Sequence, residues 1–190
     1  MKTSDERVFL WRHFTLREAV LLGFCATFII LTRAGLRLHL HLPGHVMFFT
    51  MFFFLLARGC VPKIGSVTLV GLITCLASAL LGMGNVGVMV LVLYLLPALV
   101  VEVIGVVYPK FINGLLACAA VGMVASAVRA ATASSVEVMI GLEDEFLVAK
   151  AITSITMNAV FGGLGSLAVP SIVRTLKRNG LIDDPASEAA

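Results

Sequence analysis

Charged side chains are scarce in this sequence. Asp, Glu, Lys and Arg make up 13% of its 190 residues, whereas soluble domains carry roughly 25%. Hydrophobic residues make up 59%, and the mean hydropathy is +1.04. Because a hydrocarbon core takes roughly 20 apolar residues of helix for each crossing, the sequence predicts an all-α integral membrane protein. It leaves no room for a soluble domain and gives no sign of a nucleic-acid partner.

Catalytic and metal-binding motifs are also missing. The sequence has no H-E-x-x-H, no G-x-S-x-G, no phosphate-binding loop and no paired carboxylates within its apolar segments. Its four cysteines lack C-x-x-C spacing, so we interpret them as small core residues rather than metal ligands or disulfides. The segment before the first apolar run has no h-region with a cleavage site, so we expect no removable signal peptide. No enzymatic activity, cofactor or bound metal is expected.

Six apolar segments predict a six-helix bundle. They are Leu16–Thr32, Val46–Ala57, Ile64–Leu81, Val88–Val107, Phe111–Ala131 and Ala151–Val173. Together they form one membrane domain over 16–178, preceded by a tail over 1–15. The polar tail over 179–190 is expected to be disordered.

The orientation follows from the distribution of Lys and Arg between alternate loops. One side receives ten of the fourteen, which are Lys2, Arg7, Arg12, Arg17, Arg58, Lys63, Lys110, Arg174, Lys177 and Arg178. The other side receives Arg33, Arg37, Arg129 and Lys150. Because basic residues favour the cytoplasmic side, we expect both termini to be cytoplasmic in a multi-pass protein of the plasma membrane.

The first external loop, 33–45, carries Arg33, Arg37, His39, His41 and His45, although basic residues are disfavoured on that side. In one interpretation the arginines extend to the lipid headgroups. In another the loop folds over an external cavity and contributes polar contacts to a ligand. His39 and His41 would also share one face of an extended segment, as two metal ligands must. No fourth ligand is evident for such a metal, and the arginines would repel a cation.

Three further polar residues are expected at a similar depth on the outer side. Tyr94 lies about two turns into the fourth segment, Asn158 about two turns into the sixth, and Asn85 is in an outer glycine turn. With the basic loop they predict one outward-facing binding pocket. Tyr and Asn also form packing hydrogen bonds between helices, which is the alternative interpretation.

Glu102 is the only carboxylate within an apolar segment. A carboxylate in a membrane is a functional candidate by default. However, it lies in the inner third of its segment, within reach of the cytoplasmic edge. We therefore favour a structural ion pair with Arg58 or Lys63.

Small residues on the first segment form a possible docking face. Ala19 and Gly23 are four residues apart, and Ala26 is close to the same face. Small residues allow close helix approach in lipid. This face therefore suits either packing within the bundle or a second membrane protein.

The order of several motifs resembles the substrate-binding S component of energy-coupling factor (ECF) vitamin transporters. These motifs are Gly65-Ser-Val-Thr-Leu-Val-Gly-Leu72, Gly82-Met-Gly-Asn85 and Tyr94-Leu-Leu-Pro-Ala98. The Ala19/Gly23 pair resembles the A-x-x-x-A docking pattern of that family, with Gly in place of the second Ala. The resemblance implies capture of a vitamin-like solute from outside, for a transmembrane coupling protein driven by two ATPase subunits. Members that bind cobalt or nickel carry His near the N-terminus, whereas the first His here is His13, which argues against a metal substrate.

Two other classes stay open. A membrane scaffold or assembly subunit would use the small-residue faces for partners and bind no solute. A small lipid-modifying enzyme would pair a histidine of the 33–45 loop with Glu143 or Glu145. The sequence ranks both below the solute-binding interpretation.

Overall fold

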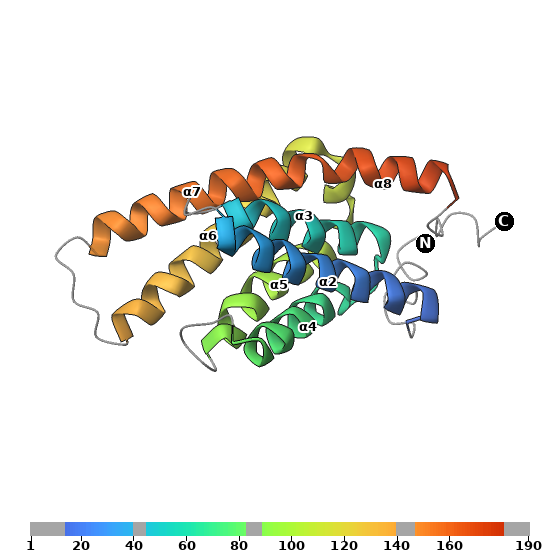
Figure 1. Ribbon diagram of the computed structural model, residues 1–190. Helices are drawn as coiled ribbons and strands as arrows, with labels where there is room; N and C mark the ends of the chain where they lie inside the picture. The colour runs from blue at the N-terminus through green and yellow to red at the C-terminus, as the bar shows by residue number, and fades with distance from the viewer. Residues whose placement is uncertain (1–13, 40–44, 83–88, 140–146, 181–190) are drawn as a thin grey trace.

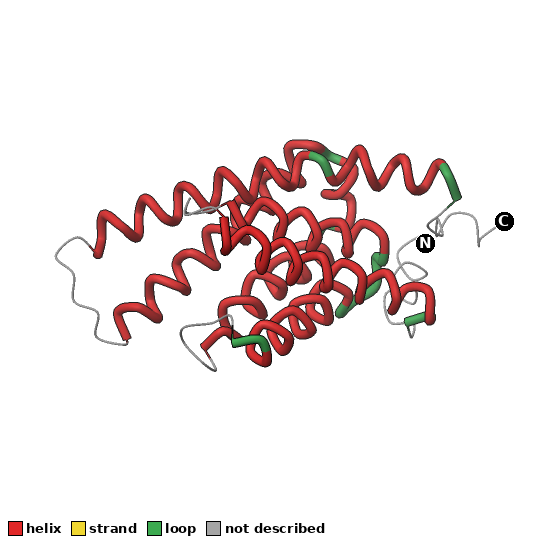
Figure 2. Tube along the Cα trace, in the orientation of Figure 1, coloured by secondary structure: helices red, strands yellow, loops and turns green. Residues whose placement is uncertain are grey.

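The computed structural model describes residues 14–39, 45–82, 89–139 and 147–180, and nearly all of them are helical (Figures 1 and 2). The elements are α2 (Leu16–His39), α3 (His45–Cys60), α4 (Ser66–Leu80), α5 (Met89–Val107), the 3₁₀ helix η1 (Pro109–Asn113), α6 (Leu115–Met139), α7 (Leu147–Leu167) and α8 (Val169–Arg178). These residues include no strand, which confirms the all-α fold class.

The helices run back and forth between two ends of the bundle. In Figure 1, α2, α4 and α6 finish at the left-hand end, where α3, α5 and α7 begin. We call this the α7 end. The start of α2, the turn between α3 and α4, and α8 lie at the opposite end, which we call the α8 end.

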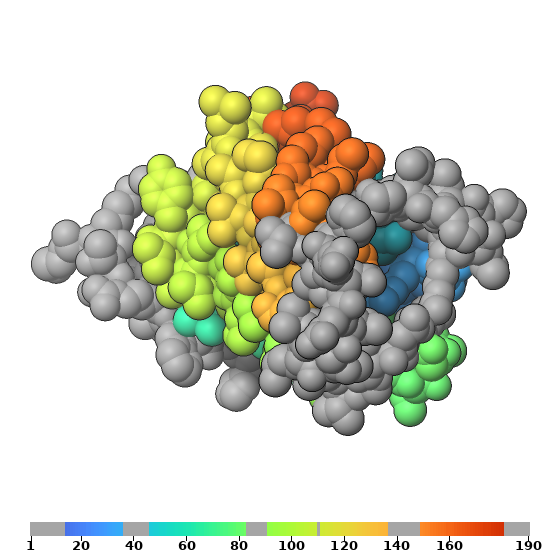
Figure 3. All heavy atoms as spheres, turned by 90° about the vertical axis from the view of Figure 1, so that its left-hand side faces the viewer, coloured from blue at the N-terminus to red at the C-terminus, as the bar shows by residue number. Residues whose placement is uncertain are grey.

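α3 is the central helix and contacts every other α-helix among those described. Its buried side chains, including Met51 and Phe54, form the core together with residues of α2, α4, α5 and α6. α6 packs most extensively against α7, and α4 packs against α5. Figure 3 shows α6 and α7 side by side when the molecule is viewed from the α7 end.

The outer surface of the bundle is apolar. On α2, Leu16, Val20 and Phe24 are spaced four residues apart, and each is more than half exposed. Large exposed apolar surfaces of this kind are unfavourable in water and mark contact with lipid or protein. Three helical stretches are long and apolar enough to cross a membrane, which are Leu16–Gly35, Leu115–Val136 and Ala149–Arg178. Shorter apolar helices cover Val46–Cys60, Ser66–Leu80 and Leu91–Val107.

The predicted end of the first segment is wrong. α2 continues seven residues beyond the predicted end at Thr32, to His39, so Arg33 and Arg37 are helical rather than part of a loop. His39 is the last residue of α2 and does not belong to an extended segment. The reason is local, because this stretch holds no proline before Pro43 and contains leucines and arginines, which are good helix formers.

The fifth and sixth segments also differ from the prediction. The fifth begins as η1, and α6 then extends to Met139, eight residues beyond the predicted end at Ala131. Arg129 therefore lies ten residues before the end of its helix, whereas the prediction places it two residues before the end. The sixth divides into α7 and α8 at Ala168. Pro170, at the beginning of α8, has no N–H to donate to the preceding turn, which explains the break.

Candidate functional site

A cluster of two arginines and a tyrosine joins three helices. Tyr94, on α5, is 1% exposed. The guanidinium carbon of Arg33, on α2, lies 4.8 Å from the centre of its ring. That of Arg129, on α6, lies 5.3 Å from the same centre. Both distances are within the range of cation–π attraction, so one aromatic ring holds two positive charges close together.

Arg129 lacks a strong hydrogen-bond acceptor. Its Nη1 donates to Sδ of Met47 on α3 at 3.0 Å, and a thioether is only a weak acceptor. Its Nε is buried without a hydrogen-bond partner. Among the described residues no carboxylate forms an ion pair with it. The side chain is therefore held in place while its charge is not neutralised.

The cluster lies toward the α7 end. Tyr94 is near the start of α5 and Arg33 near the finish of α2, both at that end (Figure 1). Arg129 is ten residues before Met139, the last residue of α6, which corresponds to roughly 15 Å of helix. A charge at this depth in an apolar helix is expensive in a membrane and marks a candidate functional site.

Four buried hydroxyls on α4 and α5 have no hydrogen-bond partner, and they belong to Ser66, Thr74, Ser78 and Tyr94. Ser66 is the first residue of α4, at the opposite end of that helix from Ser78. A Cβ added at Gly71 would lie 2.7 Å from Cβ of Ala98 and 3.4 Å from the carbonyl oxygen of Tyr94. This contact sets the register of the antiparallel helices α4 and α5. It places Thr74, which is three residues after Gly71, about level with Tyr94. Hydroxyls within helices usually bond the carbonyl four residues back, as Thr50 does here.

Asn158 is buried on α7, and its amide is used within its own helix. Nδ2 donates to the carbonyl oxygen of Ser154 at 2.7 Å and to Oγ of Ser154 at 3.2 Å. The contact between Gly122 and Gly162 sets the antiparallel register of α6 and α7. That register places Asn158 about level with Arg129. Asn158 thus lies about level with the cluster, but no described hydrogen bond joins it to the cluster.

The remaining predicted ligand-binding residues lie at or beyond the edges of what is described. Arg37, His39 and His45 belong to α2 and α3, and their side chains are outside the described part of the structure. His41 and Asn85 are outside the described residues altogether. Within the described ranges, no group of three or more His, Cys, Asp or Glu is placed to hold a metal ion.

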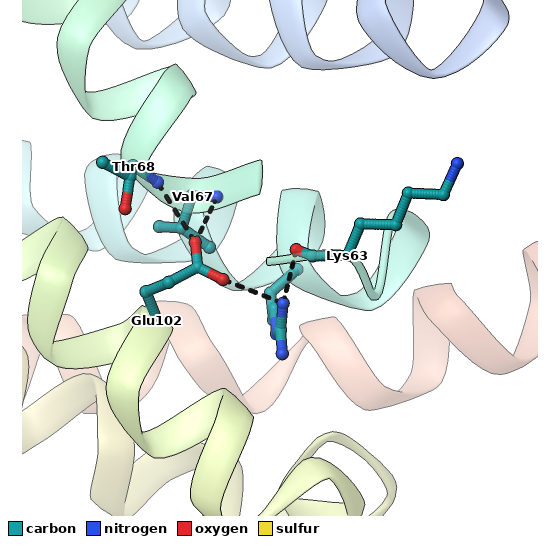
Figure 4. Close-up of polar contacts among 5 residues, drawn as sticks. Lys63, Val67, Thr68 and Glu102 are labelled. Carbon is teal, nitrogen blue, oxygen red and sulfur yellow. Dashed lines mark hydrogen bonds and ion pairs between the residues drawn. The ribbon is translucent and has the colours of Figure 1, made fainter. Parts of the chain in front are cut away.

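A second polar cluster lies toward the α8 end (Figure 4). Arg58 Nη1 is 2.9 Å from Glu102 Oε1, and the two side chains are only 2% and 8% exposed. The same Nη1 donates to the carbonyl oxygen of Lys63 at 2.6 Å. Of the two predicted partners of Glu102, the structure places Arg58 beside the carboxylate.

Glu102 also caps a neighbouring helix. Its Oε2 accepts the backbone N–H groups of Val67 at 2.9 Å and Thr68 at 3.3 Å, in the first turn of α4. Gly65, the N-cap of α4, adopts a φ of 91° and supplies no capping side chain. The Glu102 carboxylate, on α5, therefore caps the N-terminus of α4. The dipole of α4 favours a negative charge at that position.

Lys63 pairs with Glu18 of α2, and Nζ lies 2.6 Å from Oε2. Its side chain points away from Glu102 in Figure 4. Glu18 also accepts the N–H of Thr15 at 2.7 Å, next to the start of its own helix. These contacts give this cluster a structural role that ties α2, α4 and α5 together.

The three small residues predicted for docking do not share one surface. Ala19 is exposed, and a Cβ added at Gly23 would meet nothing within 4 Å. Ala26 is fully buried and belongs to the core. Only Ala19 and Gly23 are therefore open to a partner.

Arg129, Met47, Thr74 and Ser78 were not predicted to contribute to the site. Arg129 is predicted at the external end of the fifth segment, yet the sequence carries a signal that the helix continues well beyond it. Between Arg129 and Gly141 there is no glycine or proline to end a helix.

Composition, helix length and exposed apolar surface together indicate an all-helical, membrane-associated protein. No family model, curated protein or solved structure matches the chain.

Proposed function

We propose that the chain is the membrane-embedded, substrate-binding subunit of an ECF-type importer. It would capture a small, vitamin-like solute from outside and pass it to a transmembrane coupling protein driven by two ATPase subunits. The observation that supports this most is the cluster of Arg33, Tyr94 and Arg129. Three separate helices bring two guanidinium groups and a tyrosine together without a described carboxylate to pair with Arg129, and a scaffold that binds no solute gives no reason for this arrangement.

The proposal includes six membrane crossings with both termini in the cytoplasm. α3, α4 and α5 are short, and we propose that they cross where neighbouring helices cover them. The α8 end carries Arg58, Lys63, Arg174, Lys177 and Arg178, which suits the cytoplasmic side. The α7 end, with the arginine–tyrosine cluster, would then face outward at the plasma membrane.

Labelling of single cysteines tests this topology. The four native cysteines are buried, so they should react slowly and leave a low background. Asn85→Cys is expected to react with a membrane-impermeant maleimide in intact cells, and Asn179→Cys only after the membrane is opened. Reaction of both from the same side would overturn the arrangement.

The function itself is tested by separating capture from delivery. The purified chain should retain a small polar molecule that mass spectrometry detects and that an unrelated membrane protein, purified in parallel, lacks. Gly23→Leu should retain the same molecule, because the space around Gly23 is open and the bundle is undisturbed. The same variant should lose ATP-driven uptake, because bulk at the Ala19/Gly23 face blocks approach of the coupling protein.

Retention of lipids alone would exclude a capture subunit. Normal uptake by Gly23→Leu would leave solute capture intact and place the docking surface elsewhere on the molecule.

A further inference from the structure

The surroundings of Arg129 differ from those of Arg58, a cation that is buried in the bundle. Arg58 lies 2.9 Å from a carboxylate and 2.6 Å from a carbonyl oxygen. Arg129 has only a thioether and an aromatic ring. A guanidinium forms its strongest contacts with carboxylates and phosphates. The structure thus pre-positions a cation next to groups that do not neutralise it.

The surroundings of Arg129 are rich in positive charge and in spare hydrogen-bond donors. The Arg33 guanidinium lies over the same Tyr94 ring. The Tyr94 hydroxyl is buried and donates to no acceptor. The hydroxyls of Thr74 and Ser78 are also buried and unused on the adjoining α4. A bound anion would accept hydrogen bonds from these hydroxyls, whose burial without a partner costs free energy.

We propose that the solute is an organic acid whose single carboxylate pairs with Arg129 and accepts the Tyr94 hydroxyl, while its polar substituents meet Thr74 and Ser78. The inference rests on the proposed function and names its substrate class. One carboxylate matches the single guanidinium of Arg129, for which the described residues provide no strong acceptor. A phosphate carries about −1.5 to −2 charges at neutral pH and three acceptor oxygens, so it would require more donors than Arg129 and Tyr94 supply.

Matched pairs of acids and amides test the inference. The full chain in detergent, freed of retained solute, is titrated with nicotinate against nicotinamide and with benzoate against benzamide, and with inorganic phosphate. Binding is followed through the rise in melting temperature, since a ligand that binds only the folded state stabilises it. We expect each acid to bind at least about ten-fold more tightly than its amide, because a charge-assisted contact is worth roughly 1.5–3 kcal/mol.

Variants assign the effect to Arg129. Arg129→Gln should weaken acid binding by about ten- to a hundred-fold and leave amide binding unchanged, and Arg129→Lys should keep part of the preference. Arg174→Gln serves as the matched control, because Arg174 is exposed on α8 and donates to the carbonyl oxygen of Asn113. Without ligand, Arg129→Gln should melt no lower than the wild type, whereas loss of a purely structural arginine would lower the melting temperature.

Equal binding of acids and amides, or stronger binding of phosphate, would overturn the substrate class and leave solute capture standing. If no acid or amide binds and the purified chain retains no solute, both the substrate class and the proposed function are wrong.

Discussion

Glu102→Gln is expected to lower the free energy of unfolding by about 3–5 kcal/mol, the usual loss when one partner of a buried ion pair is removed. The substitution keeps the size of the side chain and an oxygen that accepts the N–H of Val67. It removes the negative charge beside Arg58, whose side chain is 2% exposed. Arg58 packs closely against α5 as well, since a Cβ added at Gly105 would lie 3.1 Å from its guanidinium carbon. Thermal or denaturant unfolding in detergent measures the loss.

Two controls separate the ion pair from other effects. The double variant Arg58→Met/Glu102→Gln should lose less stability than the two single losses added together, because neither charge is then left alone. Glu18→Gln should cost less than Glu102→Gln, because the Glu18 side chain is 20% exposed and water compensates part of the lost ion pair with Lys63. A Glu102→Gln protein as stable as the wild type would show that Arg58 finds other compensation.

Much of the fold was predictable because it depends on apolar segments longer than a turn. Each of the six predicted segments contains a helix, and the buried position of Glu102 followed from its apolar neighbours. The pairing of Lys63 with Glu18 was not predictable. It depends on α2 packing beside the turn between α3 and α4, which is a contact between residues 45 positions apart.

The candidate site was only partly predictable, for a related reason. Tyr94 and Arg33 stood out as polar residues near the ends of apolar segments. The depth of Arg129 in its helix was underestimated because hydropathy falls after Ala131, where the chain reads Ala131-Thr-Ala-Ser-Ser-Val136. Small polar residues lower hydropathy without ending a helix, so α6 continues to Met139. Met47 carried no signal, because its role depends on the approach of α6 to α3.

Gly162→Ala is expected to destabilise the protein by about 1–3 kcal/mol, as overpacking of a tight contact usually does. A Cβ at Gly162 would collide with Oγ of Ser126 and lie 2.7 Å from Cβ of Ser126 and 3.0 Å from the carbonyl oxygen of Gly122. At Gly122 the added atom would meet Ser166 in the same way, and lie 2.8 Å from the carbonyl oxygen of Gly162. The α6–α7 interface is thus built on two facing Gly-x-x-x-Ser pairs that bring the backbones together.

Gly23→Ala is the matched control for this contact, and the comparison isolates packing from helix propensity. Both glycines are helical, so alanine should favour the helix equally at the two sites. Only Gly162 has neighbours in the way; Gly23 has none within 4 Å. Unfolding in detergent should show Gly23→Ala to be neutral or slightly stabilising and Gly162→Ala to be destabilising. Adding Ser126→Gly should recover part of the Gly162→Ala loss, because it vacates the space that the new methyl needs. If the two alanine variants unfold alike, α6 and α7 do not pack through these glycines, and the register that places Asn158 level with Arg129 is lost with them.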